Sequence, residues 1–116
     1  MQALGRHLLC EYHGCSPELL NRAEHVGAEL LAAVRIAGAT PVSEFMHAFS
    51  PHGVTGVIVL AESHFAIHTW PEYGFAAVDL FTCGDAVDPY RAFEHLKGAL
   101  RAETHSVVEV RRGLIK

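Results

Sequence analysis

Two short strings, Ser16-Pro17-Glu18 and Asp88-Pro89, constrain the fold more than any other feature of this chain. Each predicts the start of a helix, because a Ser or Asp side chain caps the first turn and proline fits the first helical position. The first helix is expected to end at Gly38, and its apolar face is formed by Leu19, Ala23, Val26, Leu30, Val34 and Ala37. The second has Tyr90, Phe93, Leu96 and Leu100 on one face.

Segments with strand-like alternation lie before, between and after these helices. The predicted strands cover residues 4–12, 41–49, 54–60, 65–69, 75–83 and 106–110, followed by a short basic tail over 111–116. In the strand over 75–83, Asp79 shares a face with Ala77 and Phe81, and we expect it to be an exposed strand residue.

The predicted order is β-α-β-β-β-β-α-β, which favours an α+β fold. We expect a two-layer α/β sandwich, with a largely antiparallel sheet and both helices on one face. A length of 116 residues predicts a single domain over 1–116. Half of the residues are hydrophobic, which provides a core, although a domain of this size would also gain from oligomerisation.

Composition argues against several classes of partner. A net charge of −4 argues against a nucleic-acid or anionic-membrane surface. No run approaches the roughly 20 apolar residues that span a bilayer, and the first residues lack a signal-peptide pattern. Three cysteines cannot complete a disulfide framework, so we expect a reduced, cytoplasmic protein.

Nine histidines could suggest a metal site, but they are scattered along the chain. Neither Cys-x-x-Cys nor His-Glu-x-x-His occurs, and the pair Cys10 and Cys15 has no matching second pair. The sequence therefore predicts no metal centre.

The segment Glu62–Glu72 is the strongest candidate for chemistry, because it turns polar directly after the apolar run Val57–Leu60. It contains Ser63 at an expected strand-to-strand junction and His68 five residues later, and Cys83 ends the next predicted strand. Strand histidines and single cysteines often serve only packing. From residue types and spacing alone, these three residues could have either a catalytic or a structural role.

The residue strings Glu62–Gly74 and Ala76–Gly84 closely resemble the prokaryotic S-adenosylmethionine decarboxylase proenzymes. The resemblance extends to Leu4–His7, Gly53–Val57, Asp88-Pro89 and Ala92–Leu96, and thus covers nearly the whole chain.

The resemblance implies a pyruvoyl cofactor that the chain makes from its own Ser63. The Ser63 hydroxyl would attack the carbonyl of Glu62 and convert the peptide bond to an ester, and elimination would then leave chains 1–62 and 63–116. By the family pattern, His68 is the base for this processing. Thr55 supports it at a position where serine is more usual.

The resemblance also implies the reaction, which is conversion of S-adenosylmethionine to its decarboxylated form, the aminopropyl donor for spermidine biosynthesis. The substrate amine would form a Schiff base with the pyruvoyl group, and Cys83 would be the proton donor. Phe49 would stack on the adenine and Glu72 would hold the ribose hydroxyls. Trp70 either lines the pocket or serves packing. A homodimer of processed two-chain protomers is expected.

This sequence departs from the family pattern at Thr55 and at His52, where an aromatic residue would be less surprising. Two alternatives stay open, which are a pyruvoyl-dependent decarboxylase of L-arginine or L-ornithine and an inactive unprocessed paralogue. A third, a His-rich metal-binding module, is disfavoured because the histidines are scattered along the chain. The presence of Ser63, His68 and Cys83 argues against the inactive paralogue.

Overall fold

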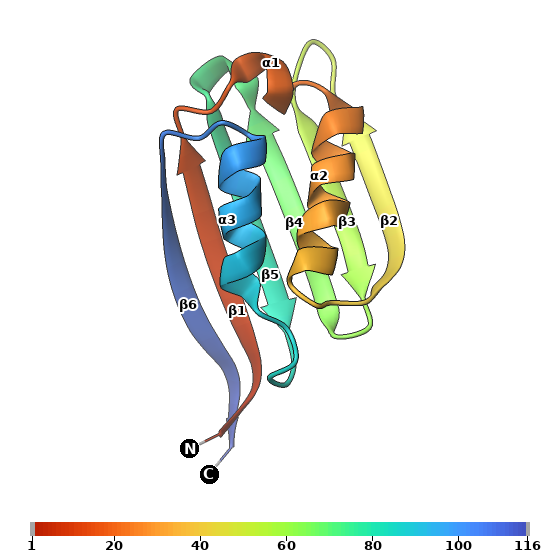
Figure 1. The fold of residues 1–116 in the computed structure, drawn as a ribbon, viewed down its shortest axis with the longest axis vertical. Coiled ribbons are helices and arrows are strands. Elements are labelled where there is room, and N and C mark those ends of the chain that lie inside the picture. Colours follow the sequence, from red (N-terminus) through yellow and green to blue (C-terminus); the bar gives the residue numbers. More distant parts are fainter. Residues whose placement is uncertain (1, 116) are drawn as a thin grey trace.

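The computed structural model describes residues 2–115 of the chain. Its strands are β1 (Gln2–His13), β2 (Pro41–Ala48), β3 (Val54–Leu60), β4 (Ser63–Trp70), β5 (Phe75–Thr82) and β6 (Thr104–Ile115). They form one antiparallel sheet in the order β2-β3-β4-β5-β1-β6 (Figure 1). Sequence neighbours pair from β2 to β5, and β1 then inserts between β5 and β6.

The helices lie together on one face of this sheet (Figure 1). They are α1 (Pro17–Leu20), α2 (Ala23–Ile36) and α3 (Pro89–Ala99), and a 3₁₀ turn, η1 (Pro71–Tyr73), joins β4 to β5. The predicted α+β two-layer sandwich is confirmed. Within residues 2–115, none of the helices has the length and apolar character needed to cross a membrane.

Both predicted helix starts are confirmed by capping bonds. The Ser16 side chain accepts from the Leu19 N–H at 3.3 Å, and the Asp88 side chain accepts from the Tyr90 N–H at 3.2 Å. Gly38 follows the last turn of α2 with φ 81°, a left-handed conformation that suits glycine.

The prediction of one continuous first helix is wrong, because the chain breaks between α1 and α2. Asn21 caps α1, and Arg22 is extended, with φ −100° and ψ 101°. The break has partners elsewhere in the fold. The Asn21 side chain accepts from the Gly53 N–H at 3.0 Å, and the Leu20 carbonyl accepts from the Thr69 hydroxyl at 2.9 Å. Tertiary hydrogen bonds override a helical pattern that is locally consistent.

The prediction for the C-terminal segment is also wrong. Instead of a strand over 106–110 and a basic tail, β6 runs from Thr104 to Ile115 and pairs along β1 as far as Gln2. Strand pairing uses backbone groups, so β1 can hold this polar segment although it lacks an apolar alternation. Residue 116 of the predicted tail lies outside the described residues.

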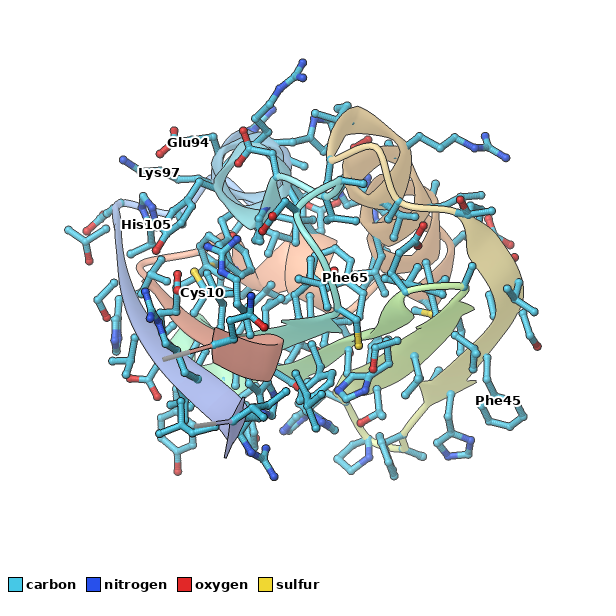
Figure 2. All side chains as sticks on the ribbon, turned by 90° about the horizontal axis from the view of Figure 1, so that it is seen from below. Cys10, Phe45, Phe65, Glu94, Lys97 and His105 are labelled. Atoms are coloured by element: carbon cyan, nitrogen blue, oxygen red, sulfur yellow. The ribbon has the colours of Figure 1, made fainter. Side chains whose placement is uncertain are left out.

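The core lies between the helices and the inner face of the sheet. In Figure 2, Phe65 lies between sheet and helices, whereas Phe45 points away from the core on the far side. Among residues 2–115, no helix or strand covers the outer face of the sheet (Figure 1). This face exposes large apolar side chains, which include Leu9, Phe45, Val59, Trp70 and Val110.

Candidate active site

The predicted cleavage junction is the tight turn between β3 and β4. Leu60 pairs with Ser63 across this turn, so Ala61 and Glu62 form a two-residue loop. Ser63 has φ 155°, a backbone conformation that residues other than glycine rarely adopt. Strain therefore lies at the residue whose preceding peptide bond is the predicted cut site.

Contacts on both sides hold Glu62 in this turn. Its carbonyl oxygen accepts from the backbone N–H of Cys83 at 3.1 Å. Its carboxylate accepts from the Thr40 N–H at 3.0 Å and from the Thr40 hydroxyl at 3.3 Å. The Cys83 N–H polarises the carbonyl that the Ser63 hydroxyl would attack, as an oxyanion-hole donor does.

Cys83 directly follows β5 and lies at the same end of the sheet as Ser63. Ser63 pairs with Thr82 in the register of β4 and β5. The Cys83 side chain is exposed, and Gly84 continues the chain with φ 79°. The structure therefore brings together two of the predicted catalytic residues, Ser63 and Cys83.

The other cysteines have a different environment. Cys10 and Cys15 are buried in the core, and burial raises the pKa of each thiol to about 11. All three cysteines are free, and Cys83 alone is exposed.

His68 lies at the other half of β4, and the structure does not bring it to Ser63 within one chain. Five residues of strand separate the two by roughly 16 Å, at about 3.3 Å per residue. His68 is exposed on the outer face, and its Nδ1 lies 3.0 Å from the Thr55 hydroxyl of the paired strand. The predicted pair Thr55 and His68 thus forms a unit, but apart from Ser63 and Cys83.

A cavity of about 390 Å³ opens beside this pair. All three predicted substrate-binding residues, Phe49, Trp70 and Glu72, line this cavity. The rest of its wall includes His52, Gly53, Val54 and Thr69. Phe49 and Trp70 are about half exposed, and Trp70 also contacts Phe75, with a ring separation of 5.5 Å. Both interpretations of Trp70, pocket wall and packing, agree with these contacts.

Glu72 enters the cavity as an ionised carboxylate. A hydrogen bond from its own backbone N–H, assisted by His52, lowers the pKa of Glu72. His52 Nε2 lies 2.6 Å from Glu72 Oε2. An ionised carboxylate accepts hydrogen bonds only, which suits a ligand that presents hydroxyl groups.

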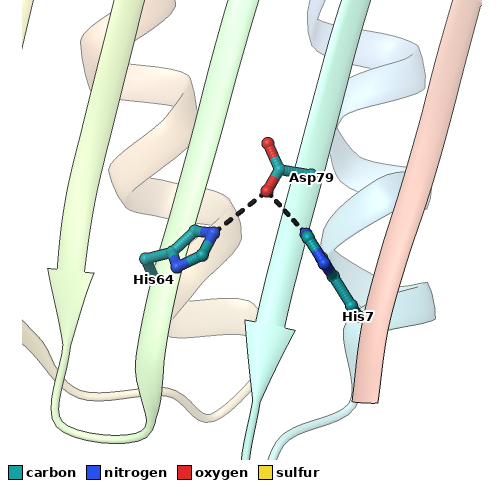
Figure 3. A group of neighbouring side chains, drawn as sticks. All are labelled: His7, His64 and Asp79. Atoms are coloured by element: carbon teal, nitrogen blue, oxygen red, sulfur yellow. Dashed lines mark hydrogen bonds and ion pairs between the residues drawn. The ribbon is translucent and has the colours of Figure 1, made fainter. Parts of the chain in front are cut away.

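A cluster that the sequence did not predict lies on the outer face near Ser63. His7 of β1 and His64 of β4 both point at Asp79 of β5, with Nε2 to Oδ2 distances of 2.9 and 3.0 Å (Figure 3). The expected exposed Asp79 is instead half-buried between two imidazoles. Strand alternation could have placed all three on one face, but only the order β4-β5-β1 shows that they meet.

The cluster resembles a three-ligand metal site, since its ligand atoms lie within 4.8 Å of one another. Its hydrogen bonding argues for a different arrangement. Arg112 Nη1 lies 3.1 Å from His7 Nδ1, and a guanidinium can only donate, so His7 carries its proton on Nε2 and donates it to Asp79. A metal on Nε2 would require a proton on Nδ1, facing the Arg112 donor. The arrangement therefore fits a hydrogen-bonded cluster better than a metal centre.

The family is shown by comparison with known proteins. The family model described as S-adenosylmethionine decarboxylase matches residues 6–113. This chain belongs to the S-adenosylmethionine decarboxylase family. A protein of Thermotoga petrophila named S-adenosylmethionine decarboxylase proenzyme is 53% identical over 113 residues, which cover 97% of this chain and 87% of that protein.

Further members of the decarboxylase family agree with this assignment. A proenzyme of the same name from Thermodesulfovibrio yellowstonii is 50% identical over 115 residues, covering 99% of this chain and 85% of the relative. The crystal structure of the adenosylmethionine decarboxylase of Aquifex aeolicus superposes with a TM-score of 0.92 at 38% identity, covering 100% of this chain and 96% of that one. None of these names points to arginine or ornithine.

Proposed function

We propose that this chain is a self-processing, pyruvoyl-dependent decarboxylase that converts S-adenosylmethionine to decarboxylated S-adenosylmethionine, the aminopropyl donor for spermidine biosynthesis. The observation that carries the proposal is the Glu62-Ser63 junction. There, an unusual backbone conformation at Ser63 meets a hydrogen bond from Cys83 to the Glu62 carbonyl. Family membership and the intact set Ser63, His68 and Cys83 support it.

The proposed processing begins with attack of Ser63 Oγ on the Glu62 carbonyl carbon. The Cys83 N–H stabilises the oxygen on which charge develops, and the C–N bond gives way to an ester. A base, assigned to His68, removes the Cα proton of residue 63, and the new C-terminal carboxylate of Glu62 leaves. This elimination makes residue 63 an enamine, dehydroalanine, which tautomerises to an imine. Water hydrolyses the imine and releases ammonia, which leaves a pyruvoyl group at residue 63.

The finished pyruvoyl group would supply an electron sink for loss of carbon dioxide. Cys83 lies beside residue 63 and is exposed, so its thiol can deliver a proton to the substrate carbon. In this proposal Phe49 stacks on the adenine, Glu72 accepts from the ribose hydroxyls and Trp70 forms the cavity wall.

The separation of His68 from Ser63 supports a homodimer with shared active sites. Ser63 and Cys83 of one protomer would combine with Thr55, His68 and the cavity of the other. The uncovered outer face of the sheet supports this assembly, because Phe45 and Trp70 expose 71% and 41% of their surface there. Such a face on a sheet is typical of a protein interaction surface.

Cytoplasmic placement stays a prediction. It is supported by the three free cysteines, which suit a reducing compartment.

Release of carbon dioxide from carboxyl-labelled substrates tests the proposed reaction. We expect release from S-adenosylmethionine and little from L-arginine or L-ornithine, since those amino acids lack the adenine and ribose that the proposal assigns to Phe49 and Glu72. The Ser63→Ala protein is the control and should release none. Faster release from arginine or ornithine than from S-adenosylmethionine would contradict the substrate assignment.

A further inference from the structure

Thr82 has an unusual side chain for a position in the core. It is fully buried, with 0% exposure, and within residues 2–115 its hydroxyl is the one buried side-chain polar group without a hydrogen-bond partner. Leaving a buried hydroxyl unpaired costs stability, so such a group in a native fold calls for an explanation.

The position of Thr82 beside the proposed cleavage site suggests an explanation for its unpaired hydroxyl. Thr82 is the register partner of Ser63 across β4 and β5, and it directly precedes Cys83. Directly opposed residues of an antiparallel pair have Cβ atoms about 4.5–5.5 Å apart, so a modest side-chain rotation lets a hydroxyl reach the side-chain oxygen of its neighbour. The unpaired hydroxyl therefore lies beside the residue that the proposed processing changes.

A second buried threonine shows that this fold can satisfy such a group. Thr69 is 6% exposed, accepts from the Val54 N–H at 2.9 Å and donates to the Leu20 carbonyl at 2.9 Å. Thr69 and Thr82 are similar in burial, but Thr69 has structural partners and Thr82 does not.

We propose that the Thr82 hydroxyl is a hydrogen-bond donor to the side-chain oxygen of residue 63 during the elimination step. This inference rests on the proposed function. In that step the base takes the Cα proton of residue 63, the Cα–Cβ double bond forms and the Cβ–Oγ bond breaks. The electron pair leaves with Oγ, which becomes an oxygen of the new C-terminal carboxylate of Glu62. A donor on Oγ stabilises the departing charge without transferring its proton.

Thr82→Val removes the hydroxyl and keeps the shape of the side chain. We expect cleavage about tenfold to hundredfold slower, the cost of losing one hydrogen bond to a charged group. The ester should accumulate, and hydroxylamine should then release fragment 63–116 with a serine at its N-terminus. Thr82→Ser should restore cleavage.

Thermal stability distinguishes a role of Thr82 in processing from a role in holding the fold together. In the uncut Ser63→Ala background, Thr82→Val should leave the midpoint of thermal unfolding unchanged or raised, because it removes an unpaired buried hydroxyl. The matched control Thr69→Val should lower that midpoint, because it leaves two backbone groups unpaired.

Three results would overturn the inference. They are cleavage of Thr82→Val at the wild-type rate, a loss of stability like that of Thr69→Val, and slow cleavage without a hydroxylamine-sensitive ester. A wild-type chain that never cuts would instead reject the proposed function itself. If Thr82→Val does not fold, cleavage by Thr82→Ala, measured beside Thr82→Ser, decides by the same criteria.

Discussion

Thr55 and His68 face each other across β3 and β4, and the Thr55 hydroxyl lies 3.0 Å from His68 Nδ1. Thr55→Ser keeps the hydroxyl and removes a methyl group, so we expect cleavage at least as fast as in the wild type. Thr55→Ala removes the hydroxyl and should slow cleavage by about tenfold. A time course of cleavage on denaturing gels measures both, and equal rates for Thr55→Ala and wild type would contradict this role.

The three thiols predict a second result for single residues. At pH 8, a thiol reagent should modify Cys83 much faster than Cys10 or Cys15, whose burial raises their pKa to about 11 and limits access. Mass spectrometry of the Ser63→Ala protein should show one fast label per chain. Denaturant should expose all three thiols, and fast labelling of Cys10 in the native protein would contradict the buried arrangement.

Among the secondary-structure elements, β6 depends on side-chain contacts beyond its own pattern. Arg6 of β1 forms an ion pair with Glu109 of β6 at 2.8 Å, and Tyr90 of α3 donates to the same carboxylate at 3.1 Å. The hydrogen bond from Arg6 lowers the pKa of Glu109 below its ordinary value of 4.5. These contacts join the edge strand β6 to its neighbour β1 and to helix α3.

Glu109→Gln should lower the free energy of unfolding by about 1 kcal/mol or less at neutral pH, because the pair is partly exposed. A lowered carboxyl pKa stabilises the fold above the ordinary value of 4.5, and this stabilisation is lost as pH falls through the folded-state pKa. The difference between variant and wild type should therefore shrink below that value. Denaturant unfolding across pH measures it, with the exposed Glu44→Gln as control; a difference that grows in acid would contradict the assignment.

Local patterns predict most elements, and long-range contacts explain the errors. The helix starts at Ser16 and Asp88 and the strand over 54–60 follow from capping and alternation, which act within a few residues. The break at Asn21 depends on Gly53, and the length of β6 depends on β1. Neither partner lies close in the sequence.

At the level of the whole molecule, the candidate site is also predicted only as far as local sequence patterns allow. The strings around Ser63 and Cys83 indicate the family, and the structure places these two residues together. The distance between His68 and Ser63 follows from the extended strand alone, at about 3.3 Å per residue, and it divides the predicted single site into two separated halves. The meeting of His7, His64 and Asp79 depends on strand order and register, which the sequence does not show.

Complementation between inactive variants tests the shared site. If His68 serves the Ser63 of its partner, coexpression of His68→Ala with Cys83→Ala should give mixed dimers with one intact site of two. Random pairing then restores about a quarter of wild-type activity. The control pair Ser63→Ala with Cys83→Ala affects the same half and should restore none. No activity from the first pair would contradict the shared arrangement.

The intact mass of the purified protein under denaturing conditions tests self-processing at Glu62-Ser63 directly. We expect fragments 1–62 and 63–116, the second without a free N-terminal amine, in both the wild type and the Cys83→Ala variant, with turnover impaired in the latter. The Ser63→Ala protein should remain a single chain of 116 residues. A wild-type chain that stays uncut, or a Ser63→Ala chain that cuts between the same residues, would contradict the mechanism.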